Sequence, residues 1–256
     1  MDKKLIYKGK AKKLSKSKLY FIPILTNILS VSCRLVINSL HKSIDIASSQ
    51  KYVDDFARLH FDNTGTSLYV TGLDNFDHNK TYIFMSNHSS WMDIASIIAA
   101  VPQNLRMVAK EGLLHIPIFG KAMNDSGFIG IDRSNRAKAI KQLDKAKQKL
   151  KEGVCIWIAP EGTRSKDGQI KEFKKGGFYL AVDLNLDIVP VFIEGAADIM
   201  PPGSMDISTN KDITIHFLKP ISTTNFSKAN LSELINIVRN KIIDKQESLR
   251  RNDVTL

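Results

Sequence analysis

The sequence predicts an α/β domain, in which a mixed, largely parallel β-sheet is flanked by helices and preceded by an N-terminal membrane-associating helical segment. Short apolar runs alternate with helical patterns through most of the 256 residues, which is typical of strand–helix–strand units. Two of those runs are apolar at nearly every position, as buried parallel strands are. A basic arm and an apolar stretch occupy the first forty residues and indicate the N-terminal segment.

The basic arm holds most of the positive charge of the chain. Residues 1–18 contain eight lysines and one acidic residue, and the net charge of the whole chain is +11. Such an arm indicates an anionic partner, either nucleic acid or an anionic membrane surface.

The apolar stretch after this arm, residues 19–33, contains no charge and ends before Arg34. A spanning helix needs about 20 predominantly apolar residues. We therefore expect a segment that lies in one leaflet while its lysines contact anionic headgroups. A single membrane span, a cleaved signal peptide and a solvated arm are the alternatives. In the membrane cases the lysines stay on the cytoplasmic side.

The rest of the chain divides into strands and helices by its apolar periodicity. The expected strands cover residues 81–86, 105–109, 128–132, 154–159, 186–193 and 213–218. Helices are expected over residues 94–101, over 134–151 with Ser134 as its cap and Gly153 after its end, and from Asn230 onward. In the last of these, Glu233 completes a capping-box pattern. Ligands of such sheets gather at the carboxyl ends of the strands.

Several enzyme classes lack their usual sequence support. Cys33 and Cys155 are too few for a disulfide framework, which is typical of a reducing compartment. The sequence contains no zinc-ligand spacing, nucleophile elbow, Walker A loop or dinucleotide fingerprint. We expect neither a metal nor a cofactor.

The first polar cluster follows the strand at residues 81–86. His88 lies in the expected strand-to-helix turn, and Asp93 follows five positions later. This spacing is that of a general base held in one tautomer by a carboxylate. The alternative is a surface histidine and a carboxylate at a helix start that never touch.

Two further clusters follow other strands. After the strand at 154–159 come Glu161, Gly162, Thr163 and Arg164. The glycine lets backbone amides approach a ligand, the hydroxyl can donate a hydrogen bond, and the guanidinium suits a phosphate. Arg133 closes the strand at 128–132. Two arginines beside a base predict a phosphate-recognising site, whereas each cluster alone is also compatible with an ordinary polar turn.

Taken in order, these segments resemble the motif set of the glycerolipid acyltransferases, and in particular of the 1-acylglycerol-3-phosphate (lysophosphatidate) acyltransferases. The matching segments are N-H-x-x-x-x-D at 87–93, G-F-I-x-I-D-R at 127–133, P-E-G-T-R-S at 160–165 and V-P-V at 189–191. Ala159 departs from the phenylalanine that is usual before Pro-Glu-Gly. The resemblance covers roughly residues 81–193 and implies a glycerol-3-phosphate acyltransferase-like fold.

The resemblance implies transfer of a fatty acyl group from a thioester to the sn-2 hydroxyl of 1-acylglycerol 3-phosphate, which yields phosphatidic acid. His88 is then the base and Asp93 its partner. The acceptor phosphate and glycerol are held by Arg133, Glu161, Gly162, Thr163 and Arg164. The donor is acyl-CoA or acyl carrier protein, and the expected place of action is the cytoplasmic face of the cell membrane. Residues 1–45 form the basic arm and membrane-associating segment, and residues 46–256 form the acyltransferase domain.

Other functions stay open at this point. The acceptor could be another lysolipid or glycerol 3-phosphate, because the motifs recognise a phosphate and a hydroxyl. Two other classes are a basic nucleic-acid-binding protein and a catalytically silent membrane scaffold. The apolar residues at 113–119 either line an acyl tunnel or pack in the core (Leu113, Leu114, Ile116, Ile118 and Phe119).

Overall fold

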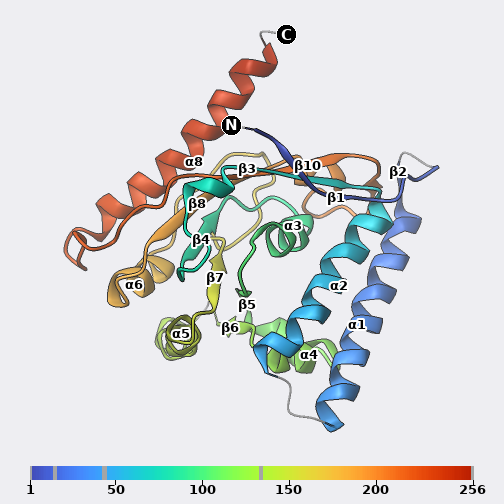
Figure 1. Ribbon diagram of the computed structural model, residues 1–256, viewed down its shortest axis with the longest axis horizontal. Coiled ribbons are helices and arrows are strands. Elements are labelled where there is room, and N and C mark those ends of the chain that lie inside the picture. Colours follow the sequence, from blue (N-terminus) through green and yellow to red (C-terminus); the bar gives the residue numbers. More distant parts are fainter. Residues whose placement is uncertain (1, 14–15, 42–44, 133–134, 255–256) are drawn as a thin grey trace.

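A computed structural model of the chain describes residues 2–13, 16–41, 45–132 and 135–254. Within these residues an eight-stranded sheet has the strand order β1-β3-β10-β8-β4-β7-β5-β6, and helices cover both of its faces (Figure 1). In that order the strands are Lys4–Lys8, Ser67–Thr71, Asp212–Phe217, Ile188–Glu194, Ile83–Ser86, Cys155–Ile158, Leu105–Lys110 and Ile129–Ile131. A separate two-stranded ladder joins β2 (Lys16–Ser17) to β9 (Ile207–Ser208).

The sheet is mixed and largely parallel, as the sequence predicts. Strands β8, β4, β7, β5 and β6 are parallel to one another. Strand β10 is antiparallel to β8 and parallel to β3, and β1 is antiparallel to β3. The carboxyl ends of these five parallel strands therefore meet at one edge.

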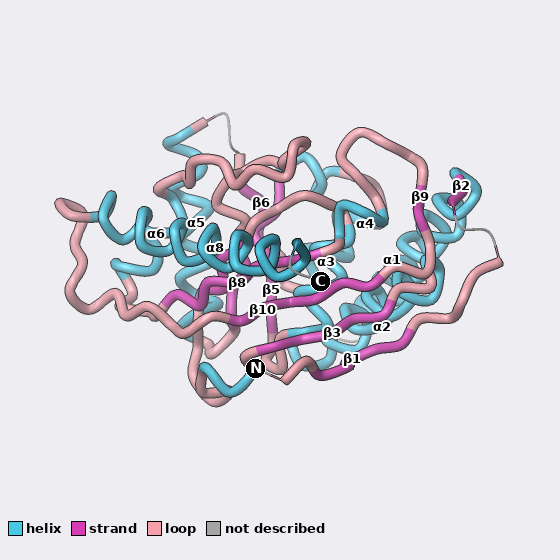
Figure 2. The backbone as a smooth tube through the Cα atoms, turned by 90° about the horizontal axis from the view of Figure 1, so that it is seen from above, coloured by secondary structure: helices cyan, strands magenta, loops and turns pink. Residues whose placement is uncertain are grey.

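The longer helices form two layers. One layer contains α1 (Phe21–His41), α2 (Ile46–Thr64), α3 (Met92–Ala100) and α4 (Phe119–Asp125); the other contains α5 (Arg136–Lys151), α6 (Gly176–Asp183) and α8 (Leu231–Val254). Figure 2 shows the same separation from above. The short helix α7 (Ala196–Ile199) follows β8, and 3₁₀ turns lie at Lys18–Tyr20, Leu73–Asn75 and Glu111–His115.

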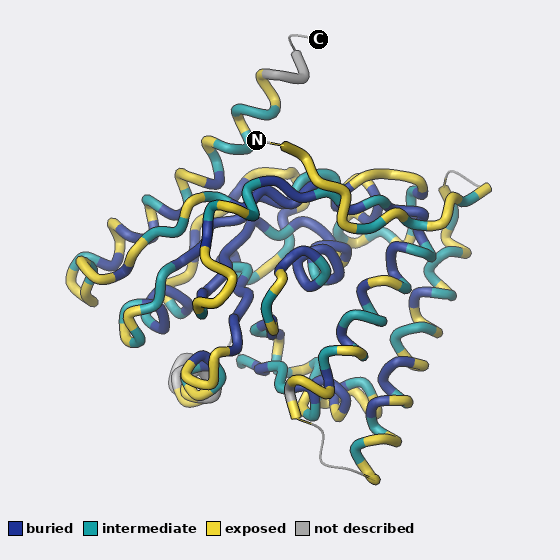
Figure 3. The backbone as a smooth tube through the Cα atoms, viewed as in Figure 1, coloured by how far each residue is buried: buried dark blue, intermediate teal, exposed yellow. Residues whose placement is uncertain are grey.

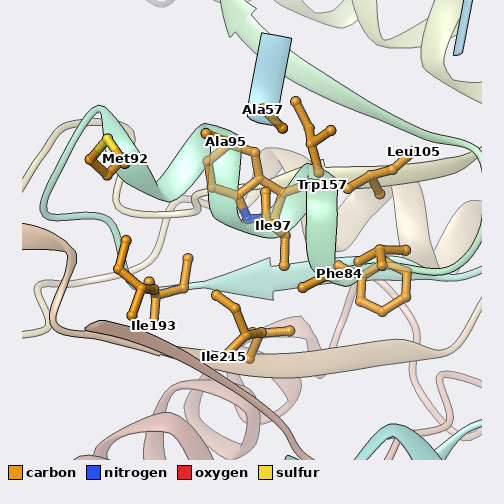
Figure 4. Close-up of a cluster of buried hydrophobic side chains, with 14 of the residues drawn as sticks. Ala57, Phe84, Met92, Ala95, Ile97, Leu105, Trp157, Ile193 and Ile215 are labelled. Atoms are coloured by element: carbon orange, nitrogen blue, oxygen red, sulfur yellow. The ribbon is translucent and has the colours of Figure 1, made fainter. Parts of the chain in front are cut away.

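Each central strand contributes to both layers because successive side chains alternate between the faces of a sheet. On β4, Ile83 and Met85 pack toward α6 and α8, whereas Phe84 packs toward α3. Figure 4 shows the buried cluster on the α3 side of the sheet, in which Phe84 and Trp157 pack together with Ile97 of α3. The central strands are accordingly buried along their length, as Figure 3 shows.

The connections place a topological switch point between β4 and β7. From β4 the chain passes through α3 to β5, and from β7 it passes through α6 to β8. Because these two strands are neighbours, their connections leave in opposite directions and on opposite faces. Ligands of open α/β sheets bind in the crevice that such a reversal creates.

The strands and helices predicted from the sequence are confirmed, with two local corrections. Helix α5 is capped by Asn135, whose side chain accepts from the backbone N–H of Lys138; the expected cap, Ser134, lies outside the described residues. Helix α8 begins after Asn230, but the side chain of Asn230 accepts from Ser227 and does not form the expected capping box.

The N-terminal segment is more structured than a basic arm. Residues 4–8 form β1, an edge strand of the main sheet, although their lysines are exposed. Helix α1 continues through Arg34 to His41, well beyond the apolar stretch that ends at residue 33. By length and composition residues Lys18–His41 could cross a membrane, which for a single helix near an N-terminus is weak evidence. The division at residue 45 stays a prediction.

Candidate active site

The end of β4 is held by the side chain of Asn87, which forms the kind of hydrogen bonds that a strand backbone forms. The side-chain amide of Asn87 donates to the carbonyl of Ile193 at 2.9 Å and accepts from the backbone N–H of the same residue at 2.8 Å. These two bonds extend the pairing of β4 with β8 by one position. The backbone is therefore held where it leaves the sheet, and His88 is the next residue.

His88 and Asp93 are in contact, as their spacing predicts. Nδ1 of His88 lies 2.8 Å from Oδ2 of Asp93, which is fully buried in the first turn of α3. The same oxygen accepts from the backbone N–H groups of Ser89 and Ser90 at 2.7 and 2.8 Å. Because an ionised carboxylate only accepts hydrogen bonds, Nδ1 carries the proton and Nε2 is left with a free lone pair.

Glu161 ties the turn after β7 to the turn after β4. Its buried carboxylate accepts from the backbone N–H of His88 at 3.0 Å and of Lys171 at 3.1 Å. Burial raises the pKa of this carboxyl, and the two amide bonds oppose the rise. Both contacts are to the protein's own backbone, whereas the sequence predicts a contact with the acceptor, and that contact stays a prediction.

The turn after β4 is the first turn of the site, and the turn after β7 is the second. The second turn has a basic side, because Lys174 lies close to Gly162 and Arg164 belongs to the turn itself. Gly162 has a φ of +72°, and a side-chain carbon added there would lie 2.9 Å from Nζ of Lys174. The guanidinium of Arg164 lies 4.9 Å above the ring of Trp91, which belongs to the turn after β4. Thr163 is exposed between them. The other expected phosphate ligand, Arg133, lies outside the described residues.

The loop at residues 165–171 and the C-terminal helix α8 hold the second turn in position. The backbone N–H of Ser165 donates to the carbonyl of His88 at 2.7 Å. Arg239 of α8 donates to the carbonyls of Ile170 and Lys171 at 2.6 and 2.9 Å. The position of Glu161 therefore depends on α8 through Lys171.

Two cavities border the turn after β4, one at Trp91 and the other at His88. An apolar pocket of about 230 Å³ lies among α1, α2, α3 and α4, with Trp91 in its wall, and of the five residues expected for an acyl tunnel Leu113 and Phe119 line it. Ile116 and Ile118 are exposed instead. A polar pocket of about 330 Å³ lies on the side of α8 and has His88 itself in its wall.

The segment that carries this geometry matches a family model. Residues 67–194, half of the chain, match the model described as Acyltransferase. The chain belongs to the acyltransferase family. The matched residues include β4, β7 and β8 with both turns, so the family assignment covers the strand ends at which the site is built.

Curated relatives and a solved structure agree with the family assignment. The chain is 34% identical over 176 residues to a chloroplastic 1-acyl-sn-glycerol-3-phosphate acyltransferase of Brassica napus, covering 68% of this chain and 49% of that protein. It is 33% identical over 199 residues to the Saccharomyces cerevisiae protein of the same description, covering 75% and 65%. The chain thus spans about half the length of the plant relative. The crystal structure of PlsC, the 1-acyl-sn-glycerophosphate acyltransferase of Thermotoga maritima, matches with a TM-score of 0.72 at 27% identity, covering 90% and 94% of the two chains.

Sequence reasoning did not assign a role to three residues that the structure places at this candidate site. Lys174 lies over Gly162, Trp91 lies beneath Arg164, and Arg239 holds the loop behind Glu161. Trp91 belongs to the segment at 87–93 that resembles a family motif, and Lys174 belongs to residues 173–178, which also resemble a stretch of these enzymes; this was the available signal. Arg239 belongs to an ordinary amphipathic helix and has no such signal.

Proposed function

We propose that this acyltransferase moves a fatty acyl group from an acyl thioester to the sn-2 hydroxyl of 1-acylglycerol 3-phosphate and so forms phosphatidic acid. The observation that carries the proposal is the 2.8 Å contact between His88 and Asp93 at the switch point of the sheet, beside the turn that bears Arg164. The names of the relatives supply the acceptor and the product.

In the proposed mechanism Nε2 of His88 takes the proton of the acceptor hydroxyl while the oxygen attacks the thioester carbonyl. The carbon–oxygen bond forms, the carbon–sulfur bond breaks, and the imidazolium returns the proton to the departing sulfur. General base catalysis of this kind contributes typically 10²–10⁴-fold. Asp93 orients the ring and stabilises the transient imidazolium through Nδ1, as the buried carboxylate of a catalytic triad does.

The acceptor phosphate lies, in this proposal, at the basic side of the second turn. Arg164 supplies a forked donor, and Gly162 and Thr163 supply backbone and hydroxyl donors. Arg133 is the second proposed guanidinium. Lys174 adds a positive charge above Gly162. When the phosphate is held there, only one hydroxyl of the acceptor can face His88. Binding of the phosphate therefore orients the acceptor for the reaction.

The apolar pocket suits a fatty acyl chain. Its wall consists mainly of apolar residues, most of them from four helices, and Trp91 lies three positions from His88. Leu25 lines this pocket and is also half exposed on α1. A chain that enters from a lipid surface would therefore reach the pocket along α1.

We further propose that α1 places the enzyme at the cytoplasmic face of the cell membrane. Its outer side exposes a row of large apolar residues at helical spacing: Ile22, Leu25, Leu29, Ile37 and Leu40. Exposed lysines precede the helix, and near an anionic surface each contributes about 1 kcal/mol. The donor is acyl-CoA or acyl carrier protein.

The test is a transfer assay with the purified full chain. Labelled lysophosphatidate, a second lysolipid and glycerol 3-phosphate are each offered with acyl-CoA and with acyl carrier protein thioester. We expect labelled phosphatidic acid from lysophosphatidate with at least one donor. Faster acylation of either other acceptor would refute the proposed substrate, and no transfer to any acceptor would refute the proposed activity.

A further inference from the structure

Of the described residues expected to hold the acceptor, Glu161 alone lines the polar pocket beside His88, and its two oxygens already accept from backbone amides. The pocket lies between the ends of β4 and β8, the loop at residues 165–170 and the C-terminal half of α8. Its volume of about 330 Å³ is at the lower end of the range for small-molecule sites. Arg164 lies over the ring of Trp91, which lines the apolar pocket, whereas His88 and Ser89 line the polar one.

The charges in its wall disfavour a bare phosphate close to His88. Three carboxylates line the pocket, Glu161, Glu194 and Asp198, against one basic side chain, Arg250. Two of the carboxylates are already engaged: Glu161 by backbone amides, and Glu194 by Nε2 of His216 at 3.1 Å. An anion placed among them would be repelled.

The remaining wall suits a neutral ligand rich in amide groups. Gln169 and Gln246 present side-chain amides, and the backbone of Gly168 and Gly195 is open to the cavity. Gln246 donates to the carbonyl of Gly168 at 3.0 Å, which holds the two sides of the pocket together. Amide groups offer both donors and acceptors at fixed positions, which a ligand with its own amides can match.

Arg250 lies at the exposed end of the wall, on the last turns of α8. It has no ion-pair partner among the described residues of the chain. The pocket therefore offers a reactive imidazole at one position, neutral hydrogen-bonding groups along its wall, and a guanidinium that faces solvent.

We propose that this pocket holds the phosphopantetheine arm of the thioester donor. The arm is a neutral chain with two amides that carries a thiol at one end and a phosphate at the other, and coenzyme A and acyl carrier protein share it. The sulfur would lie at His88 and the phosphate at Arg250. This inference rests on the proposed function, since it assigns to the donor the side of His88 that the acceptor leaves free.

The assignment also gives the departing group a place. When the carbon–sulfur bond breaks, the sulfur takes the proton that His88 carries and leaves along the polar pocket. The acyl chain lies on the other side, in the apolar pocket that Trp91 borders. Donor and acceptor then approach His88 from different directions and need not exchange places during the reaction.

The first test reverses the charge at the rim. Arg250→Glu should raise the KM for acyl-CoA and for acyl carrier protein thioester about tenfold, because a charge-assisted contact with the phosphate is lost. The KM for acyl-pantetheine, which has no phosphate, should stay unchanged, as should the KM for lysophosphatidate. Arg251→Glu makes the same charge change at the neighbouring exposed position, outside the pocket wall, and should leave all four values unchanged.

The second test narrows the pocket. Ala197 is partly exposed in its wall, so Ala197→Leu adds bulk to open space and should raise the KM for all three donors. A rise in the KM for lysophosphatidate with unchanged donor values would overturn the assignment, and so would wild-type kinetics in both Arg250→Glu and Ala197→Leu.

Direct binding separates this inference from the proposed function. Titration calorimetry with free coenzyme A and with pantetheine needs no acyl transfer. If the wild-type chain acylates no lysophosphatidate but binds coenzyme A with an affinity that Arg250→Glu lowers, the proposed function fails and the pocket assignment stands. Binding of coenzyme A that is equal in the wild-type chain and in Arg250→Glu overturns the assignment.

Discussion

The two turns that meet at His88 are held in place in different ways. The turn after β4 is closed by its own atoms, since Asp93 accepts from His88 and from two backbone N–H groups within five residues of itself. The turn after β7 depends on distant parts of the chain. Glu161 reaches the backbone of His88, 73 positions earlier, and Arg239 of α8 holds the loop that contains Lys171.

The first turn therefore carries the reacting imidazole, whereas the contacts of the second turn hold the two turns in position. A change to the imidazole in the first turn removes a reacting group but leaves the backbone contacts of the turn in place. A change in the second turn leaves the reacting groups intact but loosens the frame that joins them. We therefore expect variants of the two turns to differ in whether stability falls together with activity.

The largest effect is expected at His88. His88→Ala removes the proposed base and should lower kcat by 10²–10⁴-fold. The melting temperature should change little, because the side chain is partly exposed and the backbone amides that bind Asp93 and Glu161 remain. Stopped assays and thermal unfolding of the same preparation measure both. Full activity in His88→Ala would refute the assignment of the base.

The next effect concerns Arg164, which belongs to the second turn and lies against Trp91 of the first. Arg164→Ala should raise the KM for lysophosphatidate by about 10–100-fold, since a hydrogen bond to a charged group contributes about 1.5–3 kcal/mol. The KM for the thioester should change far less. Lys166→Ala, which removes an exposed charge two positions away, is the control. Equal effects of Arg164→Ala on both substrates would contradict a phosphate contact.

The first turn could be predicted from the sequence because its geometry is local. Five positions at the start of a helix place Asp93 beneath His88 whatever surrounds them. The strands that flank the turns were found for a similar reason, because β7 and β8 are apolar along most of their length. The polar residues that follow them could therefore be assigned to one edge of a parallel sheet.

The second turn could be predicted only in part. A glycine and an arginine after a strand indicate an anion site, but nothing in the turn shows that both oxygens of Glu161 bind the backbone. Strand β1 was missed because its lysines conceal an edge strand whose partner, β3, begins at Ser67. Such contacts depend on which elements the complete fold brings together, and they cannot be predicted from a short motif.

A third prediction tests whether Glu161 holds the two turns together. Glu161→Gln replaces one acceptor oxygen by an amide, so the N–H of either His88 or Lys171 then faces another donor. An unsatisfied buried donor costs about 1–3 kcal/mol, and the amide also removes a buried charge, so the free energy of unfolding at neutral pH should fall by less than that amount, together with activity. Glu172→Gln makes the same change at an exposed neighbour and should have no effect on either.

The pH dependence of the same variant sharpens this test. Burial raises the pKa of Glu161, so the folded chain keeps this proton to a higher pH than the unfolded chain does. The stability that the protonated carboxyl contributes is therefore lost as the pH rises through the raised pKa. In Glu161→Gln this part of the pH dependence should disappear, which denaturant unfolding across the weakly acidic range measures. An unchanged pH profile would contradict the burial of a titrating carboxyl at this position.

The smallest effect is expected at Arg239, which acts on His88 only through the loop, Lys171 and Glu161. Arg239→Lys keeps the charge but cannot fork to two carbonyls, and we expect a loss of about 1 kcal/mol in unfolding free energy. Transfer should fall only a few-fold, in kcat more than in either KM, because the reacting groups are all present. Lys241→Met removes an exposed charge from the same helix and is the control. If Arg239→Lys lowered stability but left kcat unchanged, the second turn would be held independently of α8, and the contrast between the two turns would be smaller than the hydrogen bonds indicate.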